Sequence, residues 1–410
     1  MRRLLQGDVG SGKTIVALQA MLVAMENGYQ AALMAPTEIL ATQHFLAARK
    51  LLERSSRNYR IVLLTGSLDE DRKRANRGLI NRGEAQLIIG THALIEEKVE
   101  FDRLGLVVVD EQHRFGVLQR FRLMKKPTQA EPDVLVMTAT PIPRTLALSL
   151  YGDLEISVLD ELPPGRTPIV TRRVPGERAG DVWEFVRKQV ALGRQAYIVY
   201  PVIAESEKTD LKAATTMHAA LAAGPFAHRR LALLHGRLPA EERDAIMRAF
   251  RDHAIDVLVA TTVIEVGIDV PNATVMCIEH PERFGLSQLH QLRGRVGRGA
   301  EESYCILLGD VGPEARERLR VVEGTEDGFE IARADLRLRG MGDLFGERQS
   351  GVPTFRVADP LRDEALNDVA RQLASAILER DPVLERPEHA AIRRTLRDRY
   401  ARALELFRVG

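Results

Sequence analysis

The chain has few cysteines, almost no net charge and no long hydrophobic run. Its 410 residues include two cysteines, Cys277 and Cys305, which are too few for a disulfide framework or a Cys-rich metal site. The 58 Lys and Arg residues are balanced by 57 Asp and Glu residues, so the net charge is +1. No global positive field therefore points to a nucleic-acid partner, and any such binding must depend on local clusters and main-chain groups.

Signals for membrane insertion or secretion are also lacking. Apolar runs such as residues 106–109 are far too short to cross a bilayer. The first eight residues, Met-Arg-Arg-Leu-Leu-Gln-Gly-Asp, contain no apolar core of a signal peptide. Together with the low cysteine content, these features predict a cytoplasmic protein with no membrane partner.

The composition is that of a globular protein. Hydrophobic residues make up 45% of the chain and charged residues 28%, which excludes intrinsic disorder as a description of the whole chain. At roughly 100–200 residues per domain, the length predicts two or three domains.

Short apolar runs alternate with turns and helical stretches along most of the chain. The runs are continuous, as in strands buried on both faces of a parallel sheet. Residues 13–27 are apolar nearly all round and precede Gly28, which indicates a buried crossover helix and its end. The predicted strands are residues 3–6, 31–35, 61–64, 87–89, 106–109, 134–137 and 156–159 in the first half and 196–199, 231–234, 257–259, 275–278 and 305–308 in the second.

The strand pattern is interrupted once and then ends before the tail. Three prolines and a glycine within residues 163–168 indicate a linker between two α/β domains. From about Glu323 the chain is charged and mostly helix-like. The predicted boundaries are a first domain at 1–162, a linker at 163–174, a second domain at 175–322 and a helical C-terminal region at 323–410.

One motif near the start has the pattern of a phosphate-binding loop, G-x-x-x-x-G-K-[ST]. A predicted strand precedes it and a predicted helix follows it, so main-chain N–H groups and the helix dipole would surround a phosphate. Lys13 would reach the β- and γ-phosphates of a nucleotide and Thr14 would offer a hydroxyl to Mg²⁺. The predicted nucleotide-binding residues are Gly7, Asp8, Val9, Gly10, Ser11, Gly12, Lys13 and Thr14.

Two carboxylates end the predicted strand at residues 106–109. Asp110 would hold Mg²⁺, and Glu111 would orient or deprotonate the attacking water. A strand that ends in Asp-Glu is often only a strand end, but together with the phosphate loop the pair indicates a nucleotide hydrolase. His113, just beyond, is interpreted as a coupling residue or, alternatively, as a polar core histidine.

A third motif places three arginines within six residues of the second half. Residues 291–299 read Gln-Leu-Arg-Gly-Arg-Val-Gly-Arg-Gly. Guanidinium groups suit phosphate, and we interpret Arg295 and Arg298 as catalytic fingers that reach the γ-phosphate across the cleft between the domains. The alternative is a solvated basic face, against which the glycines and Gln291 argue.

These motifs resemble those of superfamily 2 helicases, and the Asp-Glu-Gln-His-Arg-Phe-Gly form at 110–116 resembles the RecG family of bacterial helicases and the neighbouring transcription-repair coupling factors. The tail at 328–351 is similar to the translocation segment of both, and its Gln-Ser-Gly ending with a short remaining C-terminus favours the RecG family. The resemblance covers nearly the whole chain. The other segments that carry it are residues 35–41, 90–92, 138–145 and 260–269.

The resemblance implies two tandem RecA-like domains and an ATP-dependent DNA helicase that moves on duplex DNA during branch migration and fork reversal in DNA repair and recombination. It implies ATP and Mg²⁺ in the site, with Gly267 and Asp269 touching the ribose or the metal from the second domain. Loop hydroxyls and helix N-termini that follow strands would grip DNA phosphates without a basic surface. The implied DNA-binding and coupling residues are Pro36, Thr37, Thr91, His92, His113, Thr138, Thr140, Thr261, Thr262, Gln291, Arg337, Arg339 and Gln349. Met341 stands where the family usually has proline.

The resemblance also implies that this chain corresponds to the motor part only, since the family carries a large N-terminal region with a DNA-binding wedge. We expect branched or duplex DNA as partner and a monomer; a contact with single-stranded-DNA-binding protein is left open. Two alternatives remain: the motor of a transcription-repair coupling factor, and a fragment that binds nucleotide or DNA without motor activity. An RNA helicase of the DEAH type fits the tail less well.

Overall fold

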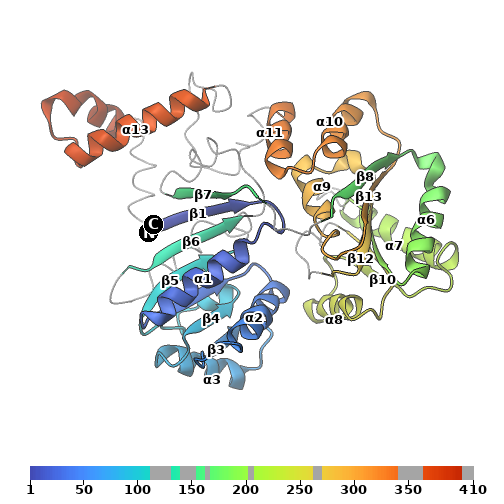
Figure 1. Cartoon of the computed structure of the whole chain (residues 1–410), viewed down its shortest axis with the longest axis horizontal. Helices are drawn as coiled ribbons and strands as arrows, with labels where there is room; N and C mark the ends of the chain where they lie inside the picture. Colours follow the sequence, from blue (N-terminus) through green and yellow to red (C-terminus); the bar gives the residue numbers. More distant parts are fainter. Residues whose placement is uncertain are drawn as a thin grey trace.

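The computed structural model describes residues 1–110, 131–138, 154–161, 167–201, 207–261, 270–339 and 363–398. Two parallel β-sheets dominate it, and helices cover both faces of each sheet (Figure 1). The α/β class and the two RecA-like domains predicted from the sequence are confirmed. Helix α13 lies apart from the second sheet, above β7 in Figure 1.

The first sheet has seven parallel strands in the spatial order β3-β4-β2-β5-β6-β1-β7. The first strand of the chain is therefore internal: Leu4 lies between Val136 of β6 and Ile156 of β7. Each strand falls where a continuous apolar run predicts it. The bounds are β1 (Arg2–Gly7), β2 (Gln30–Met34), β3 (Ile61–Leu64), β4 (Leu87–Gly90), β5 (Leu104–Val109), β6 (Asp133–Thr138) and β7 (Glu155–Leu159).

Alternate residues of these strands enter two apolar layers, one on each side of the sheet. Leu33, Ile89 and Val108 face α1 and α2, whereas Met34, Ile88 and Val109 face the side of α3. Because both faces are covered, the central residues of most of these strands are apolar on both sides, as their sequences indicate. Among the described residues of this domain, the helices are α1 (Lys13–Glu26), α2 (Glu38–Leu52), α3 (Glu70–Asn81) and the short 3-10 helix η1 (His92–Ile95). Gly28 follows α1 with a positive φ of 80°, a conformation that glycine adopts without strain.

The second sheet has six parallel strands in the order β10-β11-β9-β12-β13-β8. Five of them match the predicted runs. The sixth, β8, lies within the predicted linker, so that boundary is corrected: residues 169–174 pair with β13 at the edge of the sheet. Its Ile-Val-Thr-Arg-Arg-Val sequence has three polar residues in a row and gave no continuous apolar run, and most of the strand is half-buried. The bounds are β8 (Ile169–Val174), β9 (Gln195–Val199), β10 (Leu231–Leu234), β11 (Val257–Ala260), β12 (Ala273–Glu279) and β13 (Ser303–Leu308).

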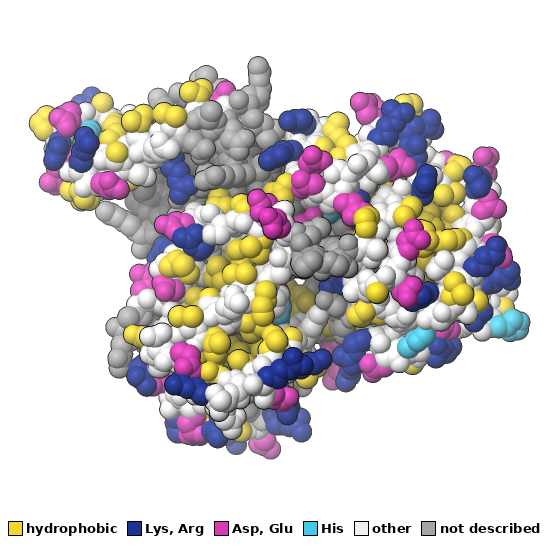
Figure 2. Space-filling model, in the orientation of Figure 1, with side chains coloured by type: hydrophobic (Ala, Val, Ile, Leu, Met, Phe, Trp, Pro, Cys, Tyr) yellow, Lys and Arg dark blue, Asp and Glu magenta, His cyan; other side chains and the backbone are white. Residues whose placement is uncertain are grey.

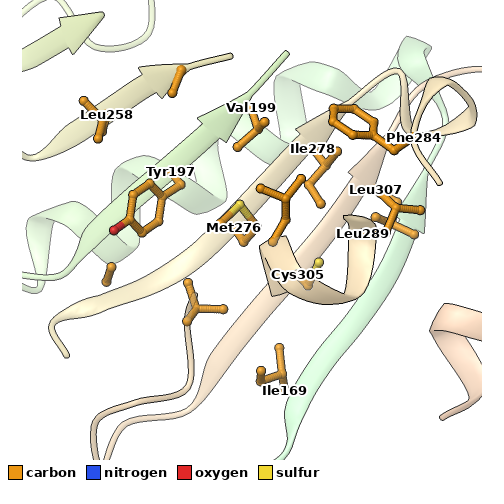
Figure 3. Packing of buried hydrophobic residues seen from close by; sticks show 14 of the residues in the cluster. Ile169, Tyr197, Val199, Leu258, Met276, Ile278, Phe284, Leu289, Cys305 and Leu307 are labelled. Carbon is orange, nitrogen blue, oxygen red and sulfur yellow. The ribbon is translucent and has the colours of Figure 1, made fainter. Parts of the chain in front are cut away.

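Helices again cover both faces of this sheet. One face packs against α6 and α7, and the other against α8, α9, α10 and α11. Figure 3 shows the second face, where Met276 and Ile278 of β12 point to the same side as Tyr197 of β9 and meet Leu289 of α9. The helices that the structure describes here are η3 (Gly176–Arg178), α6 (Ala179–Ala191), α7 (Glu207–Ala223), α8 (Ala240–Arg251), η5 (Pro281–Arg283), α9 (Leu286–Arg293), α10 (Pro313–Gly324) and α11 (Gly328–Arg339).

The C-terminal part contains α13 (Glu364–Arg380) and η6 (Pro387–His389) in the described residues. Several apolar side chains of α13 are at the surface, and Figure 2 shows them along the upper left of the molecule. On the same view, Lys and Arg are interspersed with Asp and Glu, as the balanced composition predicts. In the part of the chain that the structure describes, no helix combines the length and the apolar character that a membrane span requires.

Candidate nucleotide and nucleic-acid site

The predicted site residues of the first domain lie along one edge of the first sheet. The phosphate loop follows β1, Pro36 and Thr37 follow β2, and Asp110 follows β5. Thr91 follows β4 and Thr138 ends β6. These five strands are neighbours in the sheet, and the carboxyl ends of parallel strands share an edge, which is where ligands bind in open α/β sheets. Sequence reasoning named these residues; the strand order brings them together.

The phosphate loop is closed by its own backbone. Gly10 and Gly12 have φ values of 80° and 93°, in the left-handed region that other residues rarely adopt. A hydrogen bond from the Ser11 N–H to the Asp8 carbonyl (3.1 Å) closes the turn, and α1 begins at Lys13. Left-handed glycines within such a turn, followed by a helix N-terminus, form a concave surface of N–H groups that suits an anion.

The Lys13 side chain lies back over this loop. Its Nζ donates to the carbonyl oxygens of Gly7 (2.8 Å) and Asp8 (2.7 Å), and the residue is 9% exposed. Ser11 Oγ is buried and has no hydrogen-bond partner among the described residues. A buried cation and an unsatisfied hydroxyl in one glycine-rich turn fit a polyanionic ligand such as the phosphates of a nucleotide.

Asp110 is held by a residue that the sequence did not single out. His44, in the middle of α2, places its Nε2 2.7 Å from Asp110 Oδ2. Both side chains are nearly buried, at 10% and 14% exposure. His44 is separated from Asp110 by 66 positions and belongs to no recognisable spacing pattern, so only the fold reveals the pair.

The residues available for a divalent cation are a hydroxyl and a carboxylate. Thr14 follows Lys13 at the start of α1, and Asp110 ends β5. Both supply oxygen atoms, the donors that Mg²⁺ prefers, and Mg²⁺ in nucleotide sites usually takes only one or two protein ligands besides phosphates and water. Within the described ranges, no group of three or more His, Cys, Asp or Glu side chains is arranged to hold a metal.

The second domain meets the phosphate loop through α9 and the turn after it. A Cβ built on Gly294 would lie 2.9 Å from both Cβ and Cγ1 of Val9, so the two backbones approach as closely as glycine permits. Arg298 follows one turn later, and its Nε donates to the Gly294 carbonyl (3.1 Å). Arg295 and Arg298 are both half-buried. Burial raises the pKa of the nearby Tyr197 hydroxyl, and the positive charges of these two arginines oppose that rise.

Asp8 joins the loop to the second domain. Its Oδ1 lies 2.5 Å from His290 Nε2, and its Oδ2 accepts the N–H of Gly328 (3.1 Å), the first residue of α11. Burial alone would raise the pKa of this carboxyl, but the hydrogen bonds from His290, Val9 and Gly328 outweigh it, and the pKa is lowered. Asp8 is therefore ionised at neutral pH. Sequence reasoning assigned Asp8 to the nucleotide without foreseeing this contact.

Arg293, the first arginine of the 291–299 motif, points away from the loop. It is fully buried, and its Nη1 donates to the carbonyls of Val322 (2.7 Å) and Thr325 (2.9 Å). Its Nη2 lies 2.9 Å from His290 Nδ1. Because a guanidinium can only donate, His290 Nδ1 accepts and its Nε2–H donates to Asp8. The guanidinium of Arg293 thus supports the turn between α10 and α11.

The predicted DNA-contacting residues differ in exposure. His92 is exposed, whereas Thr91 and Thr261 are buried because each continues a buried strand. Thr37 caps α2, since its Oγ1 accepts the Leu40 N–H (3.3 Å). Thr138 is also buried, Gln291 is half-buried, and Arg337 is exposed on α11, whose last residue is Arg339. The predicted residues outside the described ranges are Glu111, His113, Thr140, Thr262, Gly267, Asp269 and Gln349.

Three family models match successive parts of the chain. Residues 2–148 match the DEAD/DEAH box helicase model, and residues 184–300 match the helicase conserved C-terminal domain. Residues 325–406 match the model of ATP-dependent DNA helicase RecG, domain 3, C-terminal. The first two matches agree with the two α/β domains, and the third begins next to α11.

Individual relatives carry the same name as the third model. The ATP-dependent DNA helicase RecG of Synechocystis is 52% identical over 406 residues, which are 98% of this chain and 48% of that protein. The helicase of the same name from Thermotoga maritima is 53% identical, over 91% of this chain and 47% of that protein. The chain spans about half the length of these curated relatives.

Solved structures of helicases are also similar to this chain. A structure of RecG bound to a three-way DNA junction matches with a TM-score of 0.73 at 50% identity, covering 90% of this chain and 47% of that one. Dbp5 of S. cerevisiae, solved with RNA, matches with a TM-score of 0.58 at 18% identity over 90% of this chain and 89% of the other. At that identity the likeness concerns the fold alone.

Proposed function

This chain is a homologue of the C-terminal motor region of RecG helicases, and we propose from this premise that it is an ATP-driven motor that moves on DNA. The whole length of the chain supports the proposal, because its matches continue from the phosphate loop into the region beyond α11. The single observation that carries it is the position of that loop: one side joins the first sheet, and the other contacts α9 and α11.

ATP is the substrate of the proposed reaction. The main-chain N–H groups of residues 8–14 would surround its phosphates, and the Lys13 ammonium would leave the carbonyls of Gly7 and Asp8 to meet the β- and γ-phosphates. Mg²⁺, held by Thr14 and Asp110, would neutralise charge on those phosphates. His44 would keep the Asp110 carboxylate in one orientation.

The second domain would complete the site from the opposite side. The backbone at Gly294 lies against Val9 of the phosphate loop. Arg295 is the next residue in the sequence and is therefore close to the phosphate-binding turn. We propose that Arg295 and Arg298 stabilise the negative charge on the γ-phosphoryl group in the transition state. Glu111 is proposed as the residue that orients the attacking water. Hydrolysis would then depend on the contact between the domains.

Duplex or branched DNA is the proposed track. The described residues assigned to DNA contacts at strand ends lie at or directly after the ends of β2, β4, β6 and β11, where polar groups can bind phosphate oxygens. Arg337 and Arg339 near the end of α11, with Gln349 beyond it, would transmit domain closure to the DNA. Branch migration and fork reversal are proposed on the same basis, with a monomer as the acting unit.

A translocation assay tests this proposal. A third strand bound to duplex DNA is displaced when a motor passes beneath it, so displacement reports movement without requiring a fork. We expect ATP-dependent displacement that is absent without Mg²⁺ and absent in the Lys13→Ala variant. If the chain hydrolyses ATP but never displaces the third strand, it is not a motor by itself. The non-motor alternative would then be supported.

A further inference from the structure

The network formed by Asp8, His290 and Arg293 connects three elements that the proposed motor must move together. Asp8 belongs to the phosphate loop, His290 and Arg293 to α9, and Gly328 is the first residue of α11. All of the contacts are polar and at least partly buried, with Asp8 9%, His290 5% and Arg293 2% exposed. The pair of Asp8 and His290 is separated by 282 positions and bridges the two domains.

We propose that Asp8 is a positioning residue that transmits the state of the phosphate loop to α11. This inference rests on the proposed function, because it presumes that the loop binds nucleotide. The Asp8 backbone carbonyl binds the Lys13 ammonium, while its carboxylate binds Gly328 and His290. One residue thus contacts the proposed phosphate-binding cation with its main chain and the C-terminal helix with its side chain.

The direction of each hydrogen bond makes the connection specific. Besides the Val9 N–H of its own loop, the carboxylate accepts from two donors outside the loop, the Gly328 N–H at the positive end of the α11 dipole and the His290 Nε2–H. His290 can donate there only because Arg293 occupies its Nδ1 with a donor. Arg293 is in turn fixed by the carbonyls of Val322 and Thr325, at the end of α10 and in the turn before α11.

A displacement of Lys13 toward a phosphate would remove the cation from the Asp8 carbonyl and let that turn move. Two routes lead from there to the beginning of α11: the direct bond from Asp8 to Gly328, and the path through His290 and Arg293 to Thr325. Buried hydrogen-bonded groups resist separation, because breaking any one bond leaves a buried donor or acceptor unpaired. The loop and the start of α11 are therefore expected to shift together.

Amide hydrogen exchange measured by mass spectrometry tests this on the full chain. The non-hydrolysable analogue AMP-PNP with Mg²⁺ is the probe, and two peptides are followed, one covering residues 5–21 and one covering residues 328–339. In the wild type we expect slower exchange in the first and a changed rate in the second. In Asp8→Asn the ratio of the α11 response to the loop response should fall to less than about one fifth of its wild-type value, since the Asn amide keeps one acceptor oxygen and its NH₂ can only donate.

Two further variants complete the experiment. His290→Gln interrupts the path through α9 at a second residue and should also reduce the α11 response. The control Asp71→Asn removes a carboxylate that is 95% exposed on α3 and should change the exchange response of neither peptide. Folding of each variant is checked by the continued burial of Cys277 and Cys305. An undiminished ratio of the α11 response to the loop response in folded Asp8→Asn overturns this inference alone. Absence of a loop response in the wild type contradicts the proposed function as well.

Discussion

His44 Nε2 lies 2.7 Å from Asp110 Oδ2, so a histidine in the middle of α2 fixes the carboxylate that ends β5. The contact connects α2, which follows β2, with the residue after β5, and β5 is the neighbour of β2 in the sheet. A ligating carboxylate that is hydrogen-bonded from behind keeps one orientation toward its metal. This relation makes His44 a residue to test.

Replacement of His44 by Ala is expected to weaken Mg²⁺ use by the ATPase. Loss of an outer partner of a metal ligand typically costs about 10- to 100-fold in metal affinity or activity. We expect the half-saturating Mg²⁺ concentration to rise about tenfold or more, as measured by ATP turnover across a Mg²⁺ titration. His228→Ala, at an exposed position in the second domain, is the matched control. An unchanged Mg²⁺ dependence in His44→Ala would show that the pair has only a structural role.

Gly294→Ala is expected to separate the second domain from the phosphate loop. The added Cβ would meet Val9 Cβ and Cγ1 at 2.9 Å, and overpacking of this kind costs about 1–3 kcal/mol. That energy corresponds to roughly a 5- to 150-fold loss of coupling between the two sites. We expect ATP turnover to fall within this range, with each domain still folded.

A second substitution tests the cause of that loss. Val9→Ala removes two of the three nearest atoms around the new Cβ, so the double variant should recover part of the turnover. If Val9→Ala gives no recovery, the Gly294 effect does not come from this contact.

The fold could be predicted from the sequence further than the site could. Continuous apolar runs located twelve of the thirteen strands in the described residues, because burial on both faces leaves a simple pattern. The strand β8 was missed because Thr171, Arg172 and Arg173 interrupt its apolar residues. The strand order, with β1 between β6 and β7, follows from long-range pairing that no local pattern encodes.

For the site, each sequence motif predicted the residues within it but not the residues that contact them from distant parts of the chain. The phosphate loop could be read from consecutive residues because glycine, lysine and threonine act within one turn. His44 could not, because its partner is far away in the sequence. Arg293 shows the converse: its motif suggests phosphate, yet its donors bind main-chain carbonyls. The spacing of arginines does not show which of them is buried.

Asp381 provides a prediction about acid stability. Its carboxylate accepts hydrogen bonds from His389 Nδ1 (2.8 Å) and from the N–H groups of Glu385 (3.0 Å) and Arg386 (2.9 Å). The bond from His389 contributes most, and the pKa of Asp381 falls from its ordinary value of 3.8 to about 2. Because the folded pKa is the lower one, its stabilising contribution is complete above the ordinary value and is lost as the pH falls toward about 2.

Thermal melting across pH can show this contribution. The difference in Tm between the wild type and Asp381→Asn should be constant near neutral pH and should shrink below about pH 4. Asp71→Asn, at a carboxylate that is 95% exposed on α3, is the control. A difference that stays constant down to pH 2.5 would contradict the assigned pKa.

The two thiols should be unreactive in the native protein. Cys277 and Cys305 are completely buried in the second domain. Burial raises the pKa of Cys305 to about 12 and that of Cys277 well above its usual range, so almost no thiolate is present at pH 8. A thiol-reactive chromophore should label neither cysteine in buffer and both in denaturant. Rapid labelling of either thiol in native protein would contradict the packing of β12 and β13.

ATP turnover with and without three-way-junction DNA tests the central claim most directly. Four proteins are compared: the wild type, Lys13→Ala, Arg298→Ala and the exposed control His228→Ala. An ATP-driven motor on DNA predicts strong stimulation by DNA in the wild type and in His228→Ala. Stimulated turnover should fall about 10³-fold or more in Arg298→Ala, the loss expected for an arginine that stabilises the transferred phosphoryl group, and should be absent in Lys13→Ala. Turnover that is absent, or equal with and without DNA, would contradict the proposal that these 410 residues form a motor by themselves.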